Sequence, residues 1–183
     1  MNVEYITDRQ LYEKILMERV PHAKSFLWMG TSDLKDLHVL SRGKWVPFLK
    51  ILAELAHKRV SIRLLHAKEP GKRFQMDFDR YPLLLQGMEK MLCPRVHFKM
   101  VIVDGVFGYC GSANLTGAGM GGKADNRRNF ENGIITTDPG LLEKMMEQFD
   151  RVWRGDFCSD CGRKDFCTEF PEMMNFPLKR KEY

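Results

Sequence analysis

Runs of apolar residues, separated by polar and glycine-containing stretches, divide the chain into short strands and helices. Apolar residues three or four positions apart predict helices, whereas compact or alternating apolar runs predict strands. In chain order we expect a helix, a strand, a helix, a strand, a helix, a two-stranded hairpin, a strand and a helix, at residues 7–20, 25–30, 45–58, 60–65, 81–92, 95–114, 130–137 and 139–153. A strand, a helix and a strand in succession predict a parallel crossover, so we expect an α/β domain.

The segments between these elements carry charges and turn-forming residues, and we expect them to be loops. They are residues 35–44, 66–80 and 115–129. Four glycines between Gly117 and Gly122 oppose regular structure and predict a mobile rim in the last segment. Residues 156–183 differ in composition from the rest of the chain. We therefore expect a domain at residues 1–155 and a small cysteine-containing appendage at 156–183.

The hairpin at 95–114 carries the polar residues that say most about function. Asp104-Gly105 is a common two-residue turn between strands, and as the loop it would pair His97 with Ser112. Because alternate side chains of a strand share a face, one face would carry His97, Lys99, Ser112 and Asn114. The other face would be core, formed by Phe98, Met100, Ile102, Phe107 and Tyr109. An imidazole, an ammonium, a hydroxyl and an amide in one small area predict a site for a phosphoryl group.

This hairpin closely resembles the signature of the phospholipase D superfamily, H-x-K-x4-D-x6-G-S-x-N. The match is complete and without a gap, at His97, Lys99, Asp104, Gly111, Ser112 and Asn114, and Glu131 fits the glutamate that follows in the family. The resemblance covers roughly residues 20–155. It implies a phospholipase D-like fold, in which one motif-bearing unit forms a mixed β-sheet flanked by helices. It also implies metal-independent phosphodiester chemistry through a phosphohistidine.

Each residue of the motif has an expected role in that chemistry. His97 would attack phosphorus, while Lys99, Asn114 and Ser112 hold the oxygens. Glu131 would orient the ring of His97 through its other nitrogen. We expect Asp104 to lie in the turn, away from the phosphate, and to organise the hairpin. No cofactor is expected for catalysis.

A second imidazole is needed to protonate the leaving oxygen, and the chain holds a single complete motif. His22-x-Lys24 has the same spacing, but Met29 stands where the aspartate belongs and no Gly-Ser-x-Asn follows. We therefore expect a homodimer with one active site across its two-fold interface, as the resemblance to single-motif members of the family implies.

Five cysteines in a chain with no recognisable export signal favour thiols or metal ligands over disulfides. Cys158-x2-Cys161-x5-Cys167 has spacing suited to a structural zinc, with Cys93 as the preferred fourth ligand. An iron–sulfur cluster uses the same ligands, and plain thiols are the third alternative. Cys110 is expected to be buried next to Lys99.

Composition bears on partners and location. The chain has 183 residues, 44% of them apolar and 29% charged, which is typical of a soluble globular protein. No run approaches the roughly 18 apolar residues of a membrane span, and the first twenty residues show no targeting segment, so we expect a cytoplasmic protein. The net charge of +5 favours anionic partners. Candidate contacts to a polyanion are Arg127 and Arg128, with Lys72, Arg73 and Lys179 to Lys181.

The favoured function is therefore a metal-independent nuclease, most simply an endonuclease. Phospholipases of the superfamily usually carry two motifs in a longer chain, for which 183 residues leave no room. Two alternatives stay open. A lipid phosphodiesterase or phosphatidyl transferase would need an apolar trough beside His97, and a non-catalytic nucleic-acid-binding protein would bind phosphate without turnover.

Overall fold

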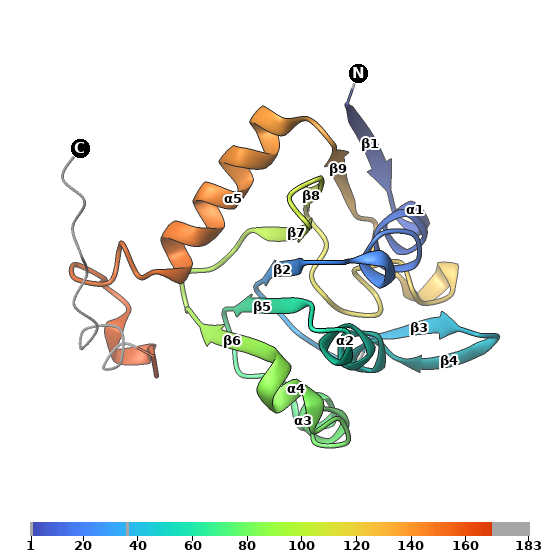
Figure 1. The fold of residues 1–183 in the computed structure, drawn as a ribbon, viewed down its shortest axis with the longest axis horizontal. Coiled ribbons are helices and arrows are strands. Elements are labelled where there is room, and N and C mark those ends of the chain that lie inside the picture. Colours follow the sequence, from blue (N-terminus) through green and yellow to red (C-terminus); the bar gives the residue numbers. More distant parts are fainter. Residues whose placement is uncertain (1, 36, 170–183) are drawn as a thin grey trace.

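The fold is built around a seven-stranded mixed sheet, in the order β1-β9-β8-β7-β2-β5-β6 (Figure 1). The computed structural model describes residues 2–35 and 37–169. Strands β2, β5 and β6 run parallel, and every other neighbouring pair is antiparallel. In sheet order the strands are Val3–Thr7, Asn132–Thr136, Phe107–Gly111, Lys99–Val103, Phe26–Thr31, Ser61–His66 and Met88–Leu92. The expected mixed sheet flanked by helices is confirmed.

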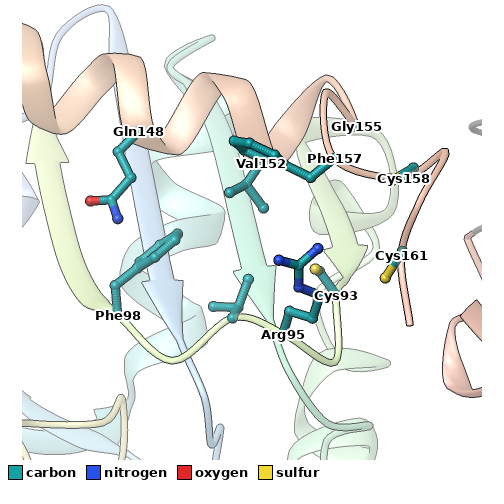
Figure 2. Close-up of a pocket in the computed structure, with 10 residues that line it drawn as sticks. Cys93, Arg95, Phe98, Gln148, Val152, Gly155, Phe157, Cys158 and Cys161 are labelled. Atoms are coloured by element: carbon teal, nitrogen blue, oxygen red, sulfur yellow. The ribbon is translucent and has the colours of Figure 1, made fainter. Parts of the chain in front are cut away.

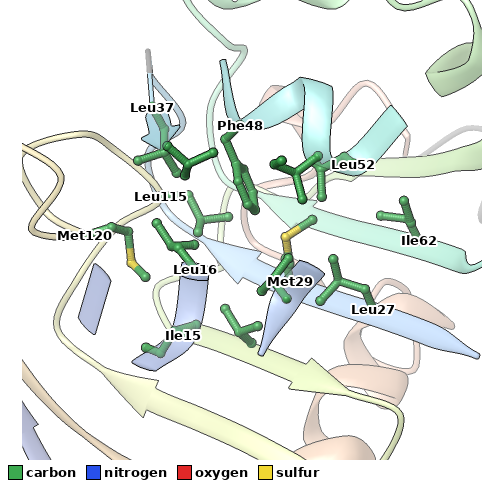
Figure 3. Close-up of a cluster of buried hydrophobic side chains, with 14 of the residues drawn as sticks. Ile15, Leu16, Leu27, Met29, Leu37, Phe48, Leu52, Ile62, Leu115 and Met120 are labelled. Carbon is green, nitrogen blue, oxygen red and sulfur yellow. The ribbon is translucent and has the colours of Figure 1, made fainter. Parts of the chain in front are cut away.

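Helices cover both faces of this sheet. One face packs against α1 (Arg9–Leu11), the π-helical turn that continues it (Tyr12–Met17), α2 (Phe48–His57), α3 (Lys72–Phe78) and α4 (Leu83–Gly87). Figure 3 shows the centre of that core, where Leu16, Met29 and Phe48 lie close together. The other face packs against α5 (Pro139–Trp153), mainly through Met145 and Phe149. The chain thus forms three layers, with a core on each side of the sheet.

Several elements follow directly from local sequence. The apolar runs of β2 and β5 form the expected parallel pair, joined by α2. Helix α5 begins as expected at Asp138, whose carboxylate accepts a hydrogen bond from Leu141 N at 2.9 Å. This bond satisfies one of the free amides of the first turn.

Other elements differ from the expectation. The supposed loop at 35–44 contains strand β3 (His38–Ser41) and part of β4 (Lys44–Pro47), which form a separate hairpin. The loop at 66–80 contains α3, and the helix expected at 81–92 is the short α4 followed by strand β6. β1 was not predicted. β1 and β6 are the edge strands of the sheet, where pairing with one neighbour outweighs a weak local pattern.

The register of the central hairpin differs from the expectation by one residue. Val103 pairs with Phe107 and Lys99 with Gly111, because Val106 extends the turn at Asp104-Gly105. A one-residue slip moves side chains to the other face. Phe107 and Tyr109 therefore share a core with Val101, under the α2 face, whereas Met100 and Ile102 pack under α5. The expected grouping of all these residues on one face is wrong.

After α5 the chain makes a series of turns as far as Glu169, with a short 3-10 helix at Lys164–Phe166. Two hydrogen bonds link this segment to the end of β6 and the loop that follows it, from Cys167 Sγ to Leu92 O and from Arg163 Nη1 to Pro94 O. Residues 170–183, which include the basic Lys179 to Lys181, lie outside the described residues. Among the helices of the described chain, none combines the length and the apolar character needed to cross a bilayer.

Candidate active site

Apart from Asp104, the motif residues lie at the end of the sheet where β2 ends and β7 begins. His97 is exposed, two residues before Lys99, the first residue of β7. A groove of about 610 Å³ opens beside it, lined by Ser32, Ala67, Lys68, Pro94, Arg95, Val96, His97 and Arg163. The expected nucleophile is therefore open to a ligand.

Lys99 lies beneath His97 and is buried, with 6% of its surface exposed. Its Nζ donates a hydrogen bond to the backbone oxygen of His97 at 2.6 Å, which leaves two ammonium protons for other acceptors. Burial lowers the pKa of Lys99 below its usual 10.5, and the carboxylate of Glu131 opposes this shift. Lys99 and Glu131 thus interact electrostatically.

Asn114 is fixed by the turn that ends β2. Its Oδ1 accepts hydrogen bonds from Ser32 N, Ser32 Oγ and Asp33 N, at 3.2, 2.9 and 3.2 Å, and lies 3.2 Å from the Thr31 hydroxyl. Since the amide oxygen is fully used, the Nδ2 donors remain for a bound anion. Asn114 can therefore act as an oriented donor.

Ser112, which follows β8, is hydrogen-bonded to Glu131, which precedes β9. The Ser112 hydroxyl donates to a carboxylate oxygen of Glu131, and it accepts from Asn132 N at 3.0 Å. The other carboxylate oxygen accepts from Asn129 Nδ2 at 3.0 Å. The described hydrogen bonds of the Glu131 side chain are thus to Ser112 and Asn129, and the expected bond to the ring of His97 is not among them. Orientation of His97 by Glu131 stays a prediction.

Asp8 holds the backbone of Glu131 in place. Asp8 Oδ1 accepts from Glu131 N at 2.9 Å, and Asp8 N donates to Glu131 O at 2.9 Å. In this position Asp8 adopts a positive φ of 46°, which is unfavourable for a residue other than glycine. Although distant in sequence, Asp8 therefore sets the position of the carboxylate.

Asp104 lies at the opposite end of β7, away from the groove. Its carboxylate accepts three hydrogen bonds, from the backbone amides of Lys24, Ser25 and Phe26 at 2.9, 2.7 and 2.9 Å. Burial raises the pKa of Asp104, but these bonds outweigh burial and hold the pKa below its usual 3.8. The geometry is that of a clamp between the hairpin turn and the start of β2.

Gly111 allows β8 and β9 to approach closely. A Cβ at this position would lie 2.3 Å from Asn132 O and 2.5 Å from the Tyr109 hydroxyl. That hydroxyl also accepts a hydrogen bond from Ala113 N at 3.2 Å. The glycine of the motif is therefore required by packing next to Ser112.

The other four histidines do not line the groove. His22 precedes β2, at the same end of the sheet as Asp104. His66 ends β5 near the groove, but it is 4% exposed, its Nδ1 bonds to Lys68 O at 2.8 Å, and burial lowers its pKa. Among the described residues, His97 is therefore the one histidine that lines the groove.

The basic residues that line the groove differ from Arg127 and Arg128, whose contact with nucleic acid stays a prediction. Arg128 is largely buried and forms an ion pair with Asp125 at 2.8 Å, and Arg127 ends a short 3-10 helix in the rim. Neither lines the groove, whereas Lys68, Arg95 and Arg163 do. Because these three come from separate segments of the chain, spacing could not have grouped them.

Metal ligands were predicted among the cysteines. All five cysteines are free thiols. Within residues 2–35 and 37–169, no three His, Cys, Asp or Glu side chains are already arranged around a position for a metal ion. Cys93, Cys158 and Cys161 nevertheless line a common cavity (Figure 2), which shares Arg95 and Val96 with the groove.

Residues 16–153 match the family model described as "Cardiolipin synthase, PLD-like domain". A relative from Chlamydomonas reinhardtii, a mitochondrial cardiolipin hydrolase, is 25% identical over 104 residues. That alignment covers 56% of this chain and 44% of the relative, so less than half of the relative's length is represented.

Solved structures of two bacterial proteins have a similar fold. Nuc from Salmonella typhimurium, a phospholipase D family member, superposes with a TM-score of 0.58 and 18% identity, covering 82% of this chain and 93% of Nuc. NucT from Helicobacter pylori gives a TM-score of 0.58 and 14% identity, covering 81% of this chain and 94% of NucT. At such identities the likeness establishes the fold.

Proposed function

The chain belongs to the phospholipase D superfamily, and from this premise we propose that it is a phosphodiesterase that hydrolyses nucleic acid through His97. The observation that carries the proposal is the groove beside His97. Lys68, Arg95 and Arg163 line it, and none of its described lining residues is acidic. A basic groove open to solvent suits a phosphodiester backbone.

The first chemical step joins His97 to phosphorus. A ring nitrogen of His97 attacks, a P–N bond forms, and the bond from phosphorus to the leaving oxygen breaks. Lys99 and the Asn114 amide are within the same site and would stabilise charge on the remaining oxygens. The leaving oxygen needs a proton at this point.

In the second step water displaces His97 from phosphorus. A base takes a proton from water, the water oxygen bonds to phosphorus, and the P–N bond breaks to release His97. One imidazole can serve as the acid of the first step and the base of the second. We assign this role to His97 of the partner subunit in a homodimer, because no second imidazole of the same chain lines the groove.

A lipid phosphodiester is the second candidate substrate. It is favoured by the printed names of the matching family and of the Chlamydomonas relative, both of which refer to cardiolipin. It is also favoured by an adjoining cavity of about 220 Å³, whose lining includes Val96, Phe98 and Val152 (Figure 2). The charged lining of the groove itself argues for the nucleic acid.

The test is a cleavage assay on four nucleic acids, one lipid and one small phosphodiester. Single- and double-stranded DNA and RNA, cardiolipin vesicles and a soluble aryl phosphodiester are each incubated with the protein, with and without brief EDTA treatment. We expect cleavage of at least one nucleic acid, unaffected by EDTA. Cleavage of cardiolipin alone would overturn the nuclease proposal, and salt-sensitive DNA or RNA binding without any turnover would overturn the enzymatic one.

A further inference from the structure

Four of the five cysteines gather at one end of the molecule, around the loop that follows β6. Cys93 lies in this loop, and the cavity of about 220 Å³ beside it is also lined by Cys158 and Cys161 from the segment after α5. Figure 2 shows the sulfur atoms of Cys93 and Cys161 facing the space between the loop and that segment. Residues far apart in sequence thus bring their thiols together.

Cys167 contacts the end of β6, just before the same loop. Its Sγ donates a hydrogen bond to Leu92 O at 3.7 Å, one residue before Cys93. Nearby, Arg163 Nη1 donates to Pro94 O at 2.8 Å. Two contacts from the appendage therefore reach the residues that flank Cys93.

The backbone between the cysteines of the appendage forms two tight turns. Cys161 N donates to Cys158 O at 3.2 Å and Cys167 N donates to Lys164 O at 3.0 Å, which closes two successive turns. A Cys-x-x-Cys turn lets two thiolates reach the same tetrahedral ion. The two remaining ligands would come from Cys167 and Cys93.

We propose that Cys93, Cys158, Cys161 and Cys167 bind one structural Zn²⁺ as a tetrathiolate site. Four thiolates close the tetrahedral shell, so no position remains for a substrate or a catalytic water. The thiols are not yet arranged around one point in the described residues. Binding therefore requires the turns at 158–167 to close onto Cys93, which couples zinc binding to folding of the appendage.

The site would fix two features of the groove. Cys93 precedes His97 by four residues, so zinc would anchor the loop that leads to the nucleophile. Arg163 lies between Cys161 and Cys167 and lines the groove, so zinc would also hold this arginine in place. The zinc proposal does not depend on which phosphodiester is cleaved.

Metal content of the purified full chain tests the proposal. Elemental analysis by mass spectrometry should give about one zinc per chain, and the double variant Cys158→Ser/Cys161→Ser should retain less than about a tenth of it. Cys110→Ser is the matched control, since Cys110 lies on β8 and does not line the cavity shared by Cys93, Cys158 and Cys161. This variant should keep its zinc.

A second measurement uses the unaltered chain, in case the double variant does not fold. Thermal unfolding is recorded before and after removal of metal with a strong chelator, and again after zinc is restored. We expect a lower Tm without metal and recovery with zinc. Three results would overturn the proposal. The protein could contain iron with acid-labile sulfide in place of zinc, or it could contain no metal and keep the same Tm with chelator and with zinc. The third is a loss of zinc in Cys110→Ser equal to that in the double variant.

Discussion

At the scale of single residues, the site depends on a buried ammonium, Lys99, held beside the carboxylate of Glu131. Burial lowers the pKa of Lys99 and Glu131 raises it. If the ammonium binds the phosphate, activity falls as pH rises through this lowered pKa, and Glu131→Gln should move that fall to a still lower pH. The measurement is kcat/KM against pH for both proteins.

The control for this pH dependence is Lys99→Arg, because a guanidinium keeps its charge throughout the range. In a folded Lys99→Arg protein the alkaline fall should disappear, even if the rate is lower. An alkaline limb at the same pH in the native chain, Glu131→Gln and Lys99→Arg would show that Lys99 does not control it.

Much of the site could be predicted from the sequence at this scale, because the motif residues lie within one hairpin. The exceptions are residues that meet only in the fold. Asp8 and Ser32 position Glu131 and Asn114 through hydrogen bonds over 123 and 82 residues of sequence. The spacing of residues along the sequence does not indicate such pairs. The turn-forming residues Thr31-Ser32-Asp33 do indicate where β2 ends.

At the scale of elements, Asp104 joins the hairpin turn to the start of β2 through three hydrogen bonds. Asp104→Ala removes the acceptor and should lower the free energy of unfolding by about 2–4 kcal/mol, because backbone amides lose a charged partner. Urea unfolding at neutral pH measures this loss. Asp79→Asn serves as the control, since the Asp79 side chain is exposed and accepts from Gln75.

The same clamp predicts a pH dependence of stability. The pKa of Asp104 is lower in the folded chain than its usual 3.8, so the folded state releases the proton more readily. Its contribution is present above the unfolded pKa and is lost as pH falls through the folded one. The stability gap between the native chain and Asp104→Asn should therefore narrow in acid, and a gap that stays constant would contradict the clamp.

The substitution Gly111→Ala tests how closely β8 and β9 must approach each other. In Gly111→Ala the new methyl would lie 2.3 Å from Asn132 O, so the strands must separate and displace Ser112 from Glu131. We expect a loss of about 1–3 kcal/mol in unfolding free energy, with a clear loss of activity. Gly71→Ala, which meets no heavy atom within 4 Å, should change neither.

Element types could be predicted where local pattern and burial agree, as for β2, β5 and α5. Met88–Leu92 was misread because Leu84, Met88 and Met91 have helical spacing, yet pairing with β5 makes this segment a strand. The register of the hairpin was mispredicted for another reason. Both faces of β7 are buried, so the apolar pattern fits either register, and the added turn residue Val106 decides between them.

At the scale of the whole molecule, the proposed dimer makes both copies of His97 serve one site. Native and His97→Ala chains can be mixed at equal amounts, unfolded and refolded so that subunits exchange at random. If two copies of His97 are needed, about one quarter of the full activity should remain, because only native pairs are active. Independent sites would leave about one half, and a monomer with full activity would exclude the shared site.

The central claim is that hydrolysis proceeds through a covalent bond to His97. The most direct measurement is a rapid-quench reaction with a cleaved oligonucleotide, in which product is quantified and the intact protein mass is read from the same samples. His22→Ala is the control, because His22 shares the H-x-K spacing but lies at the opposite end of β2. We predict an acid-labile adduct with the mass of the oligonucleotide fragment that retains the attacked phosphate, on the native chain and on His22→Ala. In His97→Ala the adduct should be absent and turnover reduced at least about a thousandfold. Turnover that persists in His97→Ala without an adduct would contradict the account.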